Sequence, residues 1–412
     1  MDTRLADFIR DTQAGKVAEE ILRKCVHCGF CTATCPTYQL LGDELDGPRG
    51  RIYLIKQVLE GKEPSAKTRL HLDRCLTCRA CETTCPSGVE YGHLLDVGRA
   101  VIESRVPRPL GEALPRALLK AVVPRPQLFS LAVGIGRAMR PLLPGSLADK
   151  LPPQPATAGP WPAPRGLARR MLVLAGCVQP ALAPNINAAT ARLLDRLGIE
   201  LFTETKAGCC GAVRHHLSDA AARDDMRRNI DAWWPHVEAA AGPAVEAIVV
   251  TASGCGVQVR DYGHILADDP DYAGKAARIS ALCRDPAEIV AAEGERLRPL
   301  LKPAARGRLA FHSPCTLQHG LKIRGVVETL LTAAGYELTP VADSHLCCGS
   351  AGSYALLQPE LAQRLRRNKL SALHAGGPAL VATANIGCLV HLQAGSLLPV
   401  RHWIELLDEA TA

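Results

Sequence analysis

The chain has 412 residues, of which 47% are hydrophobic and 4% aromatic, and its formal net charge is +7. This length predicts two or three domains. The basic balance would suit nucleic acid, but zinc-finger spacing and lysine runs with interleaved aromatic residues are missing, which argues against that class. No secretory leader and no uncharged apolar run of about 18 residues stand out, so we expect a cytoplasmic protein.

Residues 1–100 are predicted to form a mostly helical domain that carries two dense cysteine motifs. Apolar residues recur at helical spacing before the first motif, and "RGRIYLIKQVLEGKE" between the motifs also predicts a helix, ending near Gly61. The motifs are "CVHCGFCTATCP" at 25–36 and "CLTCRACETTCP" at 75–86. Both have the C-x2-C-x2-C-x3-C-P spacing that binds [4Fe–4S] clusters in bacterial ferredoxins. The domain is therefore predicted to hold two such clusters.

In two-cluster proteins with this spacing, the fourth cysteine of each run binds the other cluster. The first cluster is then assigned to Cys25, Cys28, Cys31 and Cys85, and the second to Cys75, Cys78, Cys81 and Cys35. Zinc is the alternative, but it usually takes two separated pairs of ligands, which two complete ferredoxin runs do not resemble. Nearby cations either offset the negative charge of the clusters or are simply solvated: Lys24, Arg49, Arg51, Arg74 and Arg79.

Residues 101–168 differ from the rest of the chain in being rich in proline and basic. The acidic residues of this region are Glu103, Glu112 and Asp149, and basic residues outnumber them, so the region carries over half of the net charge. It is either a solvated linker with short helices or a basic, partly apolar surface that docks a partner or anionic lipid. Its Gly134-x-Gly136 lacks the rest of a dinucleotide fingerprint, so we expect no flavin site in this chain.

Residues 169–412 contain an internal repeat, which predicts two homologous domains at 169–300 and 301–412. The cysteines of the two copies align: Cys177 with Cys315 and Cys209–Cys210 with Cys347–Cys348, both 138 residues apart, and Cys255 with Cys388, 133 apart. Short apolar runs alternate with helical stretches, which predicts Rossmann-like α/β domains with parallel sheets. Each cysteine follows a predicted strand, so the four of a copy are expected to converge at one sheet edge. The fold class is therefore α+β multidomain.

The repeat resembles the cysteine-rich "CCG" family found in heterodisulfide reductases, anaerobic glycerol-3-phosphate dehydrogenases and lactate-utilisation proteins. The family pattern is C…CCG…C-x-x-C, from which this chain departs at Ala252 and Asn385, where the first cysteine of the last pair would stand. The resemblance implies a further [4Fe–4S] cluster or zinc in each copy, the alternative being buried free thiols. The expected ligands are Cys177, Cys209, Cys210 and Cys255 in the first copy, and Cys315, Cys347, Cys348 and Cys388 in the second.

Histidines flank the second set, as proton donors, metal ligands or structural residues: His312, His319 and His345. Cys283 is left without a role. The whole arrangement, with "GPRGRIYLIK" and "TANIGCLVHLQAG", is similar to the glycolate oxidase (glycolate dehydrogenase) iron–sulfur subunit family. That resemblance implies an electron-transfer subunit without catalysis of its own, flavin-binding partner subunits, a quinone or other acceptor and peripheral contact with the cell membrane. The alternatives are the equivalent subunit of a lactate or glycerol-3-phosphate dehydrogenase, a thiol–disulfide reductase and a redox sensor.

Overall fold

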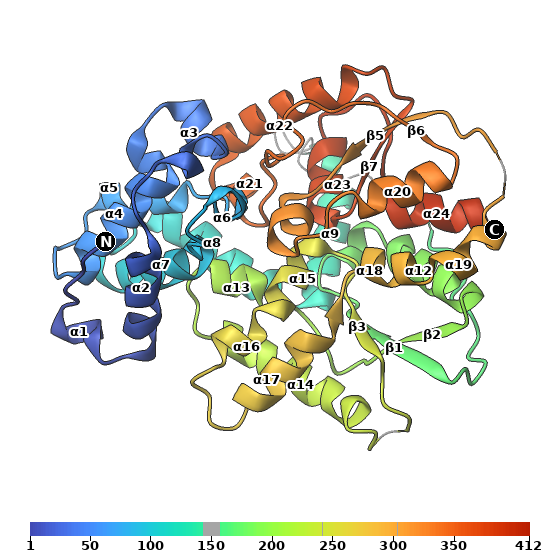
Figure 1. Cartoon of the computed structure of the whole chain (residues 1–412), viewed down its shortest axis with the longest axis horizontal. Helices are drawn as coiled ribbons and strands as arrows, with labels where there is room; N and C mark the ends of the chain where they lie inside the picture. Colours follow the sequence, from blue (N-terminus) through green and yellow to red (C-terminus); the bar gives the residue numbers. More distant parts are fainter. Residues whose placement is uncertain (143–156, 241, 303) are drawn as a thin grey trace. The chain divides into compact units, whose positions relative to one another are not determined.

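A computed structural model describes residues 1–142, 157–240, 242–302 and 304–412, which divide into two compact units (Figure 1). The first unit comprises Met1–Ala117, His216–Ser218 and His345–Lys369. The second comprises Leu118–His215, Asp219–Ser344 and Leu370–Ala412. The segment with the second Cys-Cys-Gly sequence thus belongs to the first unit, and the four domain boundaries proposed above stay predictions.

The first unit is helical, as predicted. Its core is a cluster of buried aliphatic side chains such as Leu22, Ile55 and Leu94. Gly98 of α7 lets α4 approach closely, because a Cβ at that position would lie 2.6 Å from Ile55. The helices are α1 (Asp7–Arg10), α2 (Gln13–Lys24), η1 (Phe30–Thr32), α3 (Pro36–Leu41), η2 (Glu44–Asp46), α4 (Pro48–Leu59), α5 (Ala66–Asp73), α6 (Ala80–Thr84), α7 (Tyr91–Arg105), the start of α8 (Leu110–Val122), α21 (Tyr354–Leu357) and most of α22 (Pro359–His374).

The second unit contains two parallel four-stranded sheets, which confirms the predicted α/β class. The first sheet has the order β2-β1-β3-β4 and the second the equivalent order β6-β5-β7-β8. Each order reverses beside its central strands, and ligands of such sheets bind at that switch point. The strands are β1 (Arg169–Val173), β2 (Ile199–Thr203), β3 (Ala247–Val249), β4 (Cys283–Arg284), β5 (Arg308–His312), β6 (Glu337–Leu338), β7 (Leu380–Thr383) and β8 (Val400–His402).

Most helices of the second unit follow its strands, whereas α9 and η3 precede β1. The helices are the end of α8, α9 (Pro126–Ala138), η3 (Arg140–Leu142), α11 (Gln179–Leu182), α12 (Asn185–Arg196), α13 (Ala212–His216), α14 (Ala222–Val237), α15 (Ser253–Arg260), α16 (Tyr262–Ile265), α17 (Ala273–Leu282), α18 (Pro286–Ala292), α19 (Gly294–Leu297), η4 (Arg298–Leu300), η5 (Thr316–Gly320), α20 (Val326–Ala333), the end of α22, α23 (Ile386–Gln393) and α24 (Trp403–Thr411). One apolar cluster in the second unit contains residues of both copies, so they share a core.

At the interface between the two copies the helix pairs are reciprocal: where a helix of one copy packs against a helix of the other, the counterparts of both also pack against each other. Helix α12 packs against α24, and its counterpart α20 packs against α18. Asp408 of α24, 5% exposed, accepts hydrogen bonds from Arg192 at 2.5 Å and Arg196 at 2.8 Å of α12. The helices near the cysteines are paired in the same reciprocal way: α15 packs against η5, and α11 packs against α23. The second unit therefore has internal pseudo-two-fold symmetry.

Candidate metal centres

The two ferredoxin motifs share one backbone conformation. The second residue after the first cysteine is left-handed in both, with φ of 57° at His27 and 55° at Thr77. The fourth is left-handed as well, with φ of 87° at Gly29 and 58° at Arg79. This conformation is strained for a β-branched residue such as Thr77, and strain of that kind is usual where a loop wraps a ligand. The repeated spacing thus produces a repeated loop.

The structure brings each fourth cysteine to the opposite motif, as the predicted ligand sets require. Burial raises the pKa of the Cys31 thiol to about 11, and the neighbouring Cys25, Cys28 and Cys85 groups contribute to that rise. Burial likewise raises the pKa of Cys81, with contributions from Cys78, Cys75 and Cys35. Four crowded thiolates repel one another unless a metal centre neutralises them, so both sets fit a [4Fe–4S] cluster. The identity of the bound metal stays a prediction.

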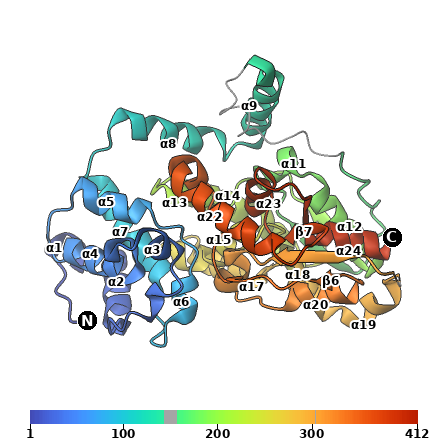
Figure 2. The same ribbon diagram turned by 90° about the horizontal axis from the view of Figure 1, so that it is seen from above.

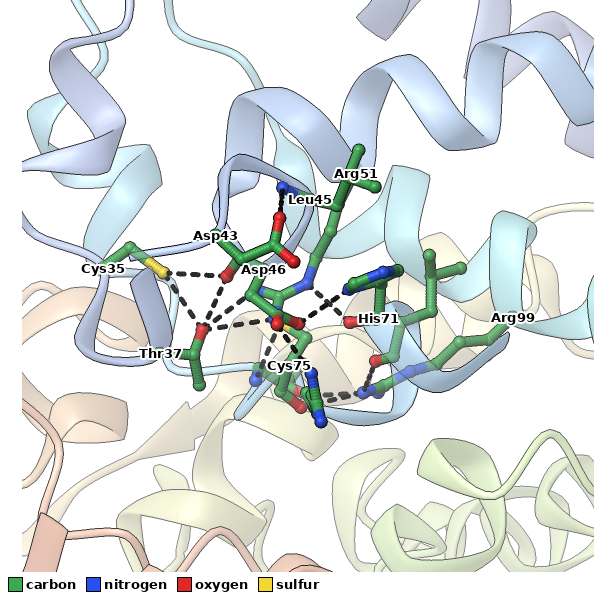
Figure 3. Close-up of polar contacts among 12 residues, drawn as sticks. Cys35, Thr37, Asp43, Leu45, Asp46, Arg51, His71, Cys75 and Arg99 are labelled. Atoms are coloured by element: carbon green, nitrogen blue, oxygen red, sulfur yellow. Dashed lines mark hydrogen bonds and ion pairs between the residues drawn. The ribbon is translucent and has the colours of Figure 1, made fainter. Parts of the chain in front are cut away.

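Beside the second set lies a buried polar network built around Asp46 and Arg51 (Figure 3). These two side chains are 0% and 1% exposed, and they form an ion pair at 3.4 Å. Both guanidinium Nη atoms of Arg51 donate to Thr37 Oγ1 at 3.2 Å, and Thr37 in turn lies 3.3 Å from Cys35 Sγ. The network therefore connects a permanent positive charge to a predicted cluster ligand through a single hydroxyl group.

The Asp46 carboxylate is saturated by cationic and imidazole partners. Its Oδ2 accepts a hydrogen bond from Arg74 at 2.8 Å, and its Oδ1 lies 3.1 Å from His71 Nδ1. Asp43, Asp46 and His71 have ligand atoms close enough together for a metal ion, but the arginines already neutralise Asp46. We therefore interpret this group as an ion-pair network that supports the cluster loop. Tyr91 adds a donor to Cys75 Sγ at 3.6 Å.

The other cations near the motifs are engaged differently. Lys24 pairs at 3.0 Å with Glu20 and Glu90, and Arg49 pairs at 2.7 Å with Glu44, all with partly exposed side chains. Such surface pairs contribute little free energy. Of the cations considered in the sequence, Arg51 and Arg74 thus join the buried network, whereas Lys24 and Arg49 form surface pairs.

All four cysteines of the first copy converge in the second unit. Cys177 follows β1, Cys209 and Cys210 follow β2, and Cys255 lies in the first turn of α15 after β3. Hydrogen bonds connect the Sγ atoms in the order Cys177, Cys209, Cys210, Cys255. Those from Cys177 and Cys210 lower the pKa of the Cys209 thiol, and the Gly211 N–H and Arg228 add to the effect. Such a set of sulfurs fits a cluster or a tetrahedral metal ion.

Two fully buried side chains hold the Cys209–Cys210 loop in place. Asn229 donates to the Cys209 carbonyl at 2.8 Å and accepts from Gly208 N–H at 2.8 Å. Tyr262 donates to the Cys210 carbonyl at 2.9 Å. Sequence reasoning missed both residues, because a single Asn on a helix and a single Tyr carry no motif. The one feature of the sequence that could have indicated them is a polar residue within an otherwise apolar helix face.

The Cys-Cys-Gly loop has the same local geometry in both copies. Gly211 and Gly349 have φ of 86° and 93°, and the N–H of each donates to Cys209 Sγ or Cys347 Sγ at 3.4 Å. A Cβ on Gly349 would lie 2.7 Å from the carbonyl oxygen of Ala362, and glycine avoids both the clash and the strain. The glycine is thus required by the sulfur-binding loop itself.

The rest of the second set lies in the second unit. Cys315 follows β5, and Cys388 lies in α23 with one ligand nitrogen of His312 within 4.8 Å of its sulfur. Asn385 Nδ2 donates to Cys388 Sγ at 3.5 Å. Because Cys347 and Cys348 belong to the first unit, convergence of this set stays a prediction. His319 is buried in η5, and His345 is partly exposed.

Cys283, which had no predicted role, is buried in β4 and donates to the Gly256 carbonyl at 3.7 Å. Burial raises its pKa to about 12, so it is protonated at neutral pH. This thiol is therefore an ordinary core residue and a useful control for the metal-binding cysteines.

Comparisons with known proteins match this arrangement of cysteines. The model of the 4Fe-4S dicluster domain matches residues 21–89, and that of the Cysteine-rich domain matches residues 171–260 and 309–393. The glycolate oxidase iron-sulfur subunit of Escherichia coli (strain K12) is 55% identical over 415 residues, covering 100% of this chain and 99% of that protein. The probable glycolate oxidase iron-sulfur subunit of Bacillus subtilis (strain 168) is 29% identical, covering 92% and 90%. Lactate utilization protein A of an Exiguobacterium species is 23% identical and covers only 57% of this chain.

Proposed function

Because the chain belongs to the glycolate oxidase iron–sulfur subunit family, we propose that it transfers electrons within a glycolate dehydrogenase. Membership makes it an iron–sulfur subunit of an oxidoreductase, which works with partner subunits. In our proposal those partners bind flavin and oxidise glycolate to glyoxylate, and this chain conducts the electrons to a quinone or another acceptor. The chain itself performs no chemistry on the substrate.

One observation supports the proposal: Cys85 lies close enough to Cys31, and Cys35 close enough to Cys81, to raise the pKa of those thiols, as two sets that exchange their fourth members would require. A [4Fe–4S] cluster takes up and releases one electron at a time. Exchanged ligands oblige two such centres to lie close together, and Arg51 supplies buried positive charge beside one of them. These are requirements for a relay of single electrons and not for a pocket that holds a hydroxy acid.

The cysteines of the CCG copies extend the proposal to further centres. In the first copy, four connected sulfurs support a third [4Fe–4S] cluster, with zinc as the alternative. In the second, Asn385 replaces a cysteine of the family pattern but still donates to Cys388 Sγ. We propose that a metal centre is held there as well and that it hands electrons to the acceptor.

The test is reduction of this chain by its partner subunits and substrate. The chain is co-purified without oxygen with its proposed flavin-binding partner subunits. Bleaching of its visible iron–sulfur absorbance is then followed by stopped flow after glycolate, D-lactate or glycerol 3-phosphate is added. We expect glycolate to bleach it within the turnover time and Cys28→Ser to slow that bleaching, with Cys283→Ser as the matched control. Faster reduction by lactate or glycerol 3-phosphate would reassign the substrate.

The isolated chain distinguishes the remaining alternatives. A thiol–disulfide reductase would reduce a disulfide from a chemical electron donor without its partners, whereas a conduit would not. A redox sensor would be reduced by the flavin subunits much more slowly than they turn over. We expect neither behaviour. The lactate utilization proteins A cover only 57% and 56% of this chain, so they support the lactate alternative less than the full-length glycolate oxidase relative supports glycolate.

A further inference from the structure

Helix α8 presents its apolar residues to solvent and turns its charged residues inward. Leu110, Leu114 and Leu118, spaced four apart, are 86%, 63% and 56% exposed. The charged stripe beside it is ion-paired: Arg116 lies 3.0 Å from Asp73, and Lys120 lies 3.6 Å from Asp219. A helix of a globular protein normally has the opposite arrangement, with its apolar stripe buried. The outer face of α8 therefore suits an apolar neighbour better than water.

Helix α9 has a second exposed apolar stripe, made by Leu128, Leu131, Ile135 and Met139, the last of these at its C-cap. These side chains are 46–60% exposed and recur at intervals of three or four, so they share one face. Helix α9 also packs against α11, so its place on the second unit does not require that face. We call the exposed residues of the two helices the leucine stripes; Figure 2 labels the ribbons of α8 and α9.

The charge around the leucine stripes is of one sign. From Ala113 to Leu142 the sequence has no acidic residue and five basic ones, namely Arg116, Lys120, Arg125, Arg137 and Arg140. Arg125 at the start of α9 and Arg140 just beyond its end are both exposed. Apolar side chains flanked by exposed arginines are the pattern of a helix that lies in the headgroup region of an anionic bilayer.

The geometry favours lying on a bilayer over crossing one. Within the described residues, a single helix of sufficient length and apolar character to cross a membrane is not found. Helices α8 and α9 reach that standard only as a pair, and they are bent by 117° at the break between them. A bend of this size is incompatible with one straight span made of the two helices.

We propose that α8 and α9 dock this protein onto an anionic lipid surface, with the leucine stripes inserted at the headgroup boundary and Arg125 and Arg140 contacting lipid phosphates. We thus assign the leucine stripes to a membrane surface and not to a partner subunit. An interface with a protein would not require positive charge at both ends of α9. The inference concerns binding alone and does not depend on which hydroxy acid is oxidised.

The test is sedimentation of the full, iron-loaded chain with vesicles. Vesicles of phosphatidylcholine are compared with vesicles of equal parts phosphatidylcholine and phosphatidylglycerol. We expect roughly tenfold stronger partitioning into the anionic vesicles, weakened by salt because the exposed charges are screened. The triple variant Leu128→Ser, Leu131→Ser, Ile135→Ser should lose about tenfold in partitioning. Leu397→Ser, at a fully exposed leucine elsewhere, is the matched control and should bind like the wild type.

The contribution of charge is tested separately. Arg125→Gln with Arg140→Gln should abolish the preference for anionic vesicles, whereas Lys16→Gln with Lys67→Gln, at exposed lysines of the first unit, should keep it. Unchanged visible and circular dichroism spectra show that each variant is folded. Equal binding of the wild type to both vesicles, or no binding, would overturn the proposal. So would a triple variant that still binds vesicles but no longer co-purifies with the flavin subunits, which would mark the stripes as a subunit interface.

Discussion

Arg51 places a permanent positive charge inside the first unit, next to the second set of ferredoxin cysteines. Burial lowers the pKa of this guanidinium. The nearby Cys75, Tyr91, Cys35 and Asp46 groups raise it by a larger amount, so the net change in pKa is upward. A reduced cluster carries one more negative charge than an oxidised one, so a fixed cation favours reduction. Arg51 should therefore make the Cys75 cluster the easier of the two to reduce.

Replacing Arg51 with methionine tests that role. We expect Arg51→Met to lower the midpoint potential of one cluster by roughly 50–100 mV, equivalent to about 1–2 kcal/mol for one electron at an effective dielectric constant of about 20. Redox titration followed by electron paramagnetic resonance measures both clusters. Arg74→Gln, at a half-buried member of the network, should shift the same cluster less, and Arg23→Gln, on the surface of α2, should shift neither. Unchanged potentials in Arg51→Met would refute the assignment.

Gly349 is the second residue at which a single substitution is informative. Alanine there would combine positive φ with a Cβ 2.7 Å from the Ala362 carbonyl oxygen, and it would misalign the N–H that donates to Cys347. We expect Gly349→Ala to lower the free energy of unfolding by about 3 kcal/mol and to lose metal from the second CCG copy. Gly352 also has positive φ, of 60°, but its site is open, so Gly352→Ala should cost only about 1 kcal/mol. Denaturation and metal analysis would show whether the two variants differ.

At the scale of elements, the helices that follow the last strand of each copy begin with equivalent capping boxes made of different residues. Asp285 caps α18 with Glu288, and His402 caps α24 with Glu405. The His402 ring accepts a hydrogen bond from Ile404 N–H at Nδ1 and donates from Nε2 to the Thr251 carbonyl at 3.2 Å. This histidine therefore both caps a helix and joins the second copy to the first in its neutral form.

The neutral form of His402 makes a contribution to stability that depends on pH. Burial lowers its pKa to about 4, whereas the unfolded chain takes up the proton near pH 6.5. The contribution is thus complete above pH 6.5 and is lost as the pH falls toward 4, by about 3 kcal/mol in total. Asparagine caps helices without titrating, so the difference in unfolding free energy between wild type and His402→Asn should shrink over that range. A difference independent of pH would contradict the assignment.

How much of the structure could be predicted from the sequence differs from one element to another. The dicluster motif and the cysteine repeat could be predicted, because both are written in the spacing of cysteines along the chain. The exchanged ferredoxin ligand sets stay a prediction. The orientation of α8, with its apolar stripe exposed, could not be predicted from the sequence. A helix with one apolar and one charged stripe can bury either stripe. Ion pairs from Arg116 and Lys120 to residues distant in sequence decide between them. The roles of Asp46 and Thr37 were missed because Arg74, which pairs with Asp46, and Arg51, which donates to Thr37, are distant from them in sequence.

For the whole molecule, the iron content decides how many centres the chain holds. Two ferredoxin clusters alone require about eight iron atoms, and each additional cubane adds about four. We expect more than eight, with a matching excess of acid-labile sulfide, after purification without oxygen. Cys210→Ala should remove about four iron atoms and Cys283→Ala none. A content of about eight in the wild type would leave the CCG sulfurs to zinc or to free thiols.

The exchanged packing of α12 with α24 and of α20 with α18 has a consequence for the history of the chain. Related helices that cover one another in reciprocal pairs are what two identical polypeptides make when they associate about a two-fold axis. We infer that the duplication fused the protomers of an ancestral homodimer. Once fused, the halves were free to diverge, and Leu174 and Ala252 now occupy the positions that His312 and Asn385 occupy in the other half.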